Sequence, residues 1–210
     1  MIEAKDEGTD WYRVFAYLLG PPSKERFSRL ALPEFQEAVG GLWCGPGGAR
    51  EPDHASMFES FEEYEACYIA LFDVSVPEPP VPLLESCYKR TVPPQQTLLE
   101  ITCFYDVINL KTDMSINSPD HLVTQLEFAA SVRYLQENSG SDSQRQILCR
   151  LERDFLDRHL LAWIPAALAR LRKLGPPVFP MLFELLLQFL HSRIDELGGP
   201  PSPPASQGDA

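Results

Sequence analysis

Apolar residues return along most of this chain at the spacing of an α-helix, and this period constrains the fold more than any other feature. Near the N-terminus they fall at Trp11, Phe15, Leu18 and Leu19, the i, i+4, i+7, i+8 pattern of one buried helix face. Glycine and two prolines then end the segment at Gly20. The sequence has no run of alternating β-branched residues that would predict a strand. We therefore expect an all-α fold, a bundle of about nine to ten helices packed on one another.

The same local signals place the other helices. A Ser56-x-x-Glu59 capping pattern predicts a helix whose buried stripe continues to Phe72. Further helices are expected after Ser23, from Pro33, from Gln95 to about Ile108, from Ser118–Pro119 to about Glu137, from Gln144, from a few residues before Pro165, and from Pro180. Residues 1–197 are predicted to form a single helical domain with a hinge at residues 138–143, and residues 198–210 a disordered tail.

The charge of the chain excludes several classes of partner. Its 30 acidic and 18 basic residues give a formal net charge of −12. Such a field repels phosphate backbones and anionic headgroups, so nucleic acid and membrane surfaces are poor partners and cationic partners are favoured. The apolar runs are too short for membrane insertion. The five cysteines include no Cys-x-x-Cys pair, which favours a reducing, cytoplasmic location.

No catalytic or metal-binding set is evident in the sequence. The histidines share no helix-face spacing and lie in no Cys/His cluster, so we interpret them as isolated surface or capping residues: His54, His121, His159 and His191. Cys67 and Cys103 fall within helical patterns and are expected in the core. A nucleophile elbow and a phosphate loop are both absent. We expect no enzyme activity, no metal and no cofactor.

Two places look like parts of a peptide-binding groove. In the first, an aromatic helix containing Tyr68, Leu71 and Phe72 leads into a proline-rich passage that ends in Glu85 at the expected rim. The three apolar residues could form the floor of a groove, although an ordinary core stripe has the same pattern.

In the second place, Asp120 and His121 occupy the second and third positions of a predicted helix. Asp120 there complements the helix dipole, and a neutral His121 could accept and donate one hydrogen bond each. Side by side, the pair could also hold an arginine guanidinium.

These segments resemble the TorD/DmsD/NarJ-type redox-enzyme maturation chaperones. Tyr68–Phe72 is similar to the aromatic-x-x-Leu-Phe motif of that family, and Glu85–Tyr88 to its Glu-Ser-x-Tyr motif. Pro119–Leu122 together with Leu126–Phe128 is similar to its Asp-His-x-x-x-x-Leu-Glu-Phe motif, and Phe155–Pro165 resembles a helix near its C-terminus. The order and spacing of the four segments are more specific than any one of them.

The resemblance implies a helical cytoplasmic chaperone that binds the twin-arginine signal peptide of a molybdenum enzyme's catalytic subunit and holds the apoprotein until molybdopterin is inserted. The client would be of the dimethyl sulfide, ethylbenzene or selenate enzyme group. The peptide-binding residues would be Tyr68, Leu71, Phe72, Leu84, Glu85, Tyr88, Asp120 and His121. Both a monomer and a domain-swapped homodimer fit. The alternatives are a small nucleotide- or cofactor-binding enzyme that uses Asp120 and His121, and a structural subunit retained in a complex.

Overall fold

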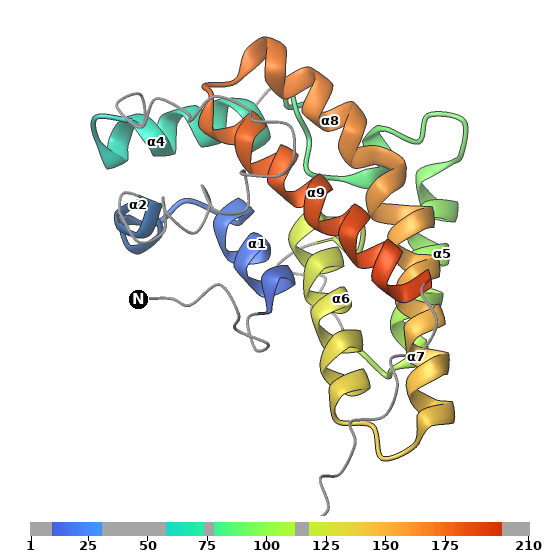
Figure 1. Cartoon of the computed structure of the whole chain (residues 1–210). Coiled ribbons are helices and arrows are strands. Elements are labelled where there is room, and N and C mark those ends of the chain that lie inside the picture. The colour runs from blue at the N-terminus through green and yellow to red at the C-terminus, as the bar shows by residue number, and fades with distance from the viewer. Residues whose placement is uncertain (1–9, 31–57, 74–77, 112–117, 199–210) are drawn as a thin grey trace, which may run out of the picture.

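The structure is a computed structural model that describes residues 10–30, 58–73, 78–111 and 118–198. Within these ranges the chain is helical (Figure 1), and the helices are α1 (Trp11–Leu19), α2 (Lys24–Leu30), α4 (Phe61–Tyr68), α5 (Pro94–Val107), α6 (Leu122–Glu137), α7 (Asp142–Phe155), α8 (Leu161–Leu174) and α9 (Val178–Gly198). Three short turns accompany them: the π-helical η2 (Ile69–Asp73) and η4 (Leu156–Leu160), and the 3₁₀-helical η3 (Glu85–Cys87). The only β-type pairing in the described ranges is one antiparallel bridge between Leu84 and His121. The all-α prediction is confirmed.

Helix α6 lies at the centre of the bundle, between α1 and α7 (Figure 1). Its inner positions include Leu126, Phe128 and Ala129, all fully buried. Helix α9 crosses the bundle and packs against α8, α7 and α1. It buries Phe183 and Leu186, as its apolar spacing predicts.

Side-chain caps explain where several of the described helices begin. Asp10 accepts a hydrogen bond from the Arg13 N–H and starts α1, which ends at Gly20 as expected. Ser23 accepts from the Arg26 N–H and starts α2. The boundaries of α5, α8 and α9 also lie close to those predicted from their prolines and glycines.

The start of α4 differs from the prediction by about one turn. Ser60 is the N-cap and accepts from the Glu63 N–H at 3.2 Å, while the Glu63 carboxylate accepts from the Glu59 N–H at 2.7 Å. Glu59 therefore precedes α4, and the prediction that it lies in the first turn was wrong, whereas Ser56 itself lies outside the described residues. The sequence contains two consecutive Ser-x-x-Glu spacings, Ser56–Glu59 and Ser60–Glu63, and local pattern alone does not select between them.

One backbone path runs from α7 through η4 into α8. The Leu161 N–H donates to the carbonyl of Leu156, a π-helical bond across η4. Helix α8 then begins at Leu161, a few residues before Pro165, as predicted. None of the described helices combines the length and apolar character needed to cross a membrane.

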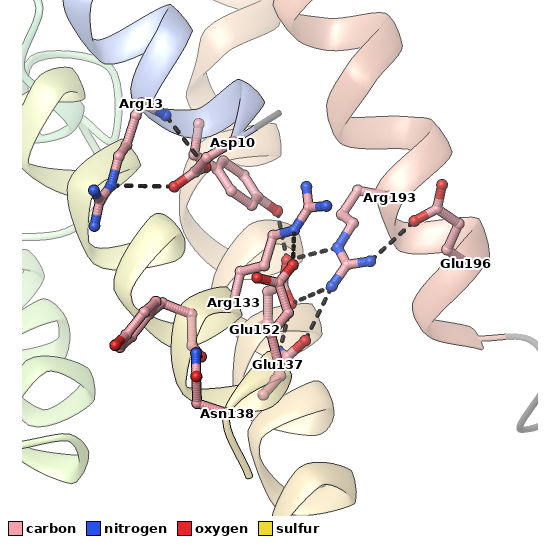
Figure 2. Close-up of polar contacts among 11 residues, drawn as sticks. Asp10, Arg13, Arg133, Glu137, Asn138, Glu152, Arg193 and Glu196 are labelled. Atoms are coloured by element: carbon pink, nitrogen blue, oxygen red, sulfur yellow. Dashed lines mark hydrogen bonds and ion pairs between the residues drawn. The ribbon is translucent and has the colours of Figure 1, made fainter. Parts of the chain in front are cut away.

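A buried carboxylate, Glu152 on α7, ties four helices together (Figure 2). It accepts hydrogen bonds from the Tyr12 hydroxyl on α1 at 2.7 Å, from Gln136 Nε2 on α6 at 2.6 Å and from Arg193 Nε on α9 at 2.8 Å. Burial, and secondarily the Glu152 charge, raises the pKa of Tyr12 well above its usual range. Figure 2 also shows Arg193 reaching the outer Glu196.

Some predictions lie outside the described residues. They are the helix from Pro33, the residues around Ser56 and the tail from residue 199. The helix count, the single domain and the hinge at residues 138–143 stay predictions; that break forms the connection between α6 and α7.

Candidate functional site

A proline-rich segment, residues 78–88, links the two places that the sequence singled out; its backbone is extended at Leu84 and then turns into the 3₁₀-helical η3. Near one end, the Val81 N–H donates to the carbonyl of Leu71 at 2.9 Å. Further along, the Glu85 N–H donates to the Asp120 carbonyl at 3.1 Å, and the Leu122 N–H to the Leu83 carbonyl at 2.9 Å. The prolines favour this extended backbone. The segment is thereby fastened to η2 at one end and to the start of α6 at the other.

The aromatic part of the site belongs to the core. Tyr68, Leu71 and Phe72 are all buried. The Tyr68 hydroxyl donates to the Leu19 carbonyl at 3.0 Å, and the Phe72 ring packs edge-on to Phe179 of α9 with the centroids 5.0 Å apart. The expectation of an open apolar floor was therefore wrong, and the ordinary core stripe is what the structure shows. Leu71 and Phe72 lie in a π-helical turn, a geometry frequent at functional sites.

His121 caps α6 from outside the helix, and Asp120 directly precedes it in the chain. The Nδ1 atom of His121 accepts a hydrogen bond from the Val123 N–H at 3.2 Å, which makes His121 the N-cap. The Asp120 carboxylate is buried and accepts from the Ser86 N–H at 3.1 Å and from the Ser118 hydroxyl at 2.6 Å. The prediction that this pair lies inside the first turn was wrong, because Asp120 bonds to a distant segment and the helix begins only after it.

Burial lowers the pKa of His121, and the neighbouring Asp120 charge acts in the opposite direction. A neutral imidazole is what the cap requires, because Nδ1 must keep a lone pair to accept the Val123 N–H.

Glu85 lies in the interior, with 0% of its surface exposed. Its Oε1 atom is 2.6 Å from Lys89 Nζ and 2.9 Å from His159 Nδ1, and its Oε2 accepts from the Gln125 amide. The expectation of Glu85 at a rim was wrong. Side chains alternate along an extended segment, so the buried Leu83 and Glu85 point inward and the half-exposed Leu84 points outward.

The partners of Glu85 include residues that the sequence did not reveal as a group. His159 is fully buried, so its interpretation as a surface or capping histidine was wrong, whereas His191 is exposed. The Nε2 atom of His159 has no hydrogen-bond partner within the described part of the chain. Gln125 bonds with its amide group to Glu85 and with its oxygen to Trp163 Nε1 at 3.1 Å. The i, i+4 spacing of His159 and Trp163 was the available signal that both face the core.

Aromatic and cationic side chains cover the end of the segment. Tyr88 stacks on Trp163 with the ring centroids 5.2 Å apart, and the Arg170 guanidinium lies 4.7 Å from the centre of the Tyr88 ring. Burial raises the pKa of Tyr88. Of the cysteines expected in the core, Cys67 is half-buried and Cys103 is exposed, so the expectation for Cys103 was wrong.

The geometry is that of an anchored surface segment. Leu84 and His121 are paired across the antiparallel bridge and are both half-exposed. Directly opposite residues of such a pair share one face, so these two side chains present an accessible part of the site, and the partly exposed Tyr88 follows four residues after Leu84. The polar groups beneath them hold the segment in place. Across the described ranges, no three His, Cys, Asp or Glu side chains are grouped to hold a metal ion.

The part of the chain that contains this site is similar in sequence to known proteins. The family model described as "Nitrate reductase delta subunit" matches residues 29–169, more than half of the chain and all eight predicted site residues. The perchlorate reductase assembly chaperone protein of Dechloromonas aromatica is 29% identical over 141 residues, which cover 66% of this chain and 63% of the relative.

Two further relatives match shorter stretches. The selenate reductase assembly chaperone protein of Thauera selenatis is 36% identical over 113 residues, or 52% of this chain and 58% of the relative. Chaperone protein TorD of Vibrio cholerae is 31% identical over 74 residues, or 35% of this chain and 32% of the relative. In each comparison the match spans less than two thirds of the relative's own length.

Proposed function

Because the chain belongs to the nitrate reductase delta subunit family, we propose that it is an assembly chaperone for the catalytic subunit of a molybdenum redox enzyme. The observation that carries this proposal is the set of relatives, which are named as assembly chaperones of perchlorate and selenate reductases. The chaperone holds the apo subunit in the cytoplasm until its molybdopterin cofactor is in place, and carries out no reaction on it.

The proposed ligand is the twin-arginine leader of the client. The half-exposed face formed by Leu84, Tyr88 and His121 makes direct contact with it. The buried members of the predicted set have a positioning role: Tyr68, Leu71 and Phe72 support one end of the proline-rich segment, and Asp120 the other. A net charge of −12 favours a basic leader over an acidic one.

Calorimetric titration of a leader peptide tests this assignment. Replacing Leu84 by Ala removes apolar contact area and is expected to weaken binding about five- to tenfold. Leu99→Ala is a matched control, because Leu99 is 66% exposed on α5 and lies outside the proposed face. Equal affinities for the two variants would remove Leu84 from the site. A wild-type protein that binds neither the leader nor the apo subunit would contradict the chaperone function itself.

Co-purification tests whether the chain binds the catalytic subunit proposed as its client. The chain is expected to capture an apo catalytic subunit that carries its leader, and to release it once the subunit holds its cofactor. Retention in the finished enzyme would indicate a structural subunit instead. Light scattering of the free chain decides between the monomer and the domain-swapped dimer.

A further inference from the structure

The Glu85 carboxylate forms a built cation site that the chain fills with its own lysine. Lys89 Nζ lies 2.6 Å from Glu85 Oε1 and also donates to the backbone carbonyl of Arg158 at 2.8 Å. Two acceptors from distant parts of the chain thus meet at one ammonium group. The Arg158 carbonyl belongs to the π-helical turn η4, a geometry frequent at functional sites.

Solvent reaches this site from the side of Lys89. The other two side chains on the carboxylate, His159 and Gln125, are fully buried, whereas 23% of the Lys89 side chain is exposed. Lys89 is therefore the one partner of Glu85 that can swing into water without opening the core. Its departure would leave Glu85 with two donors still in place, so the carboxylate would not be stranded without a partner.

An arginine suits the vacated position better than a lysine does. A guanidinium carries five N–H donors in a planar fork, and can address a carboxylate and a neighbouring carbonyl together, whereas an ammonium acts as a point charge. Lys89, the side chain that has to leave, directly follows Tyr88 in the chain, and Tyr88 belongs to the face where the leader is proposed to bind.

We propose that Lys89 is an internal substitute for a client arginine: it occupies the Glu85–Arg158 carbonyl site in the free chaperone and is displaced when the leader binds. This inference rests on the proposed function and names the part of the leader that the site selects. It also gives Glu85 a direct role despite its burial, because the leader reaches the carboxylate only after Lys89 has left.

The test is a calorimetric titration of the twin-arginine leader into Lys89 variants. Lys89→Met removes the internal competitor, and about five- to tenfold tighter binding is expected. Lys173→Met is the matched control, since it deletes one exposed positive charge on α8 and changes the net charge equally. Lys89→Arg keeps a competing cation and is expected to bind no more tightly than the wild type.

A second pair of variants ties the effect to Glu85. In Glu85→Gln the carboxylate charge is lost, so adding Lys89→Met to it should give no gain in affinity. Thermal unfolding of each protein reports whether it is folded. If the wild type binds the leader but Lys89→Met binds it no more tightly than Lys173→Met, the substitution mechanism is wrong while the chaperone function stands. If the wild type does not bind the leader, the proposed function fails first.

Discussion

His121 shows how a single side chain can set both a helix start and a pH response. It caps α6 through an unprotonated Nδ1, and burial lowers its pKa. Between that lowered value and the ordinary value of about 6.5, the unfolded chain binds a proton more readily than the folded chain. The contribution of His121 to stability is therefore complete above about pH 6.5 and is lost as the pH falls through this window.

We predict that His121→Asn, which keeps an acceptor at the cap and does not titrate, removes this part of the pH dependence. The free energy of unfolding is measured in urea at about pH 7.5 and at about pH 5.5. Between the higher and the lower pH, the wild type should lose more of this free energy than the variant does. Parallel losses in the two proteins would show that His121 does not titrate across the window.

We predict that Asp120 stabilises the fold and does not bind the ligand directly. Asp120→Ala leaves the Ser86 N–H and the Ser118 hydroxyl without their acceptor, at a cost of about 1.5–3 kcal/mol in the free energy of unfolding. Asp106→Ala, on the exposed face of α5, is the control and should change stability by less than about 0.5 kcal/mol. Chemical denaturation compares the two, and equal stabilities would mean that the Asp120 bonds contribute nothing net.

At the scale of helices, Glu152 explains how α1 and α9 belong to the bundle although both lie outside the segment that matches the family. Tyr12 comes from α1 and Arg193 from α9, and both bond to the same buried carboxylate. Apolar packing between helices gives little directional information, whereas four converging polar groups accept only one arrangement.

We predict that Glu152→Ala destabilises the protein by about 3 kcal/mol, because it leaves the mostly buried Arg193 and the Tyr12 hydroxyl without their main partner. Glu137→Ala breaks the more exposed Arg133–Glu137 pair and should cost less than about 1 kcal/mol. Urea denaturation measures the stability of both variants. The same measurement on Arg193→Met and on the Glu152→Ala/Arg193→Met double variant gives the coupling energy between Glu152 and Arg193. A coupling near zero for Glu152 and Arg193 would contradict the role of this network.

At the scale of the whole molecule, the charge of −12 acts on the rate of encounter more than on the strength of any one contact. We predict that the association rate constant with a twin-arginine leader falls several-fold when ionic strength rises from about 0.05 to about 0.5 M, since the Debye length shortens from roughly 14 to 4 Å. A leader with both arginines replaced by glutamine should show a weaker salt dependence in stopped-flow measurements. Identical slopes would exclude electrostatic steering of the arginines.

The sequence by itself determined the all-helical fold and most helix boundaries, because period, caps and proline stops act over a few residues. The glycine that ends α1 at Gly20 and the proline near the start of α8, Pro165, act locally and need no distant partner. Tertiary structure alone decided the chemistry of the site. Glu85 is buried because Gln125 and His159, 40 and 74 residues away, meet its carboxylate. Asp120 lies before α6 and accepts a hydrogen bond from Ser86, 34 residues away. Whether a charge can leave water depends on partners that no local pattern contains.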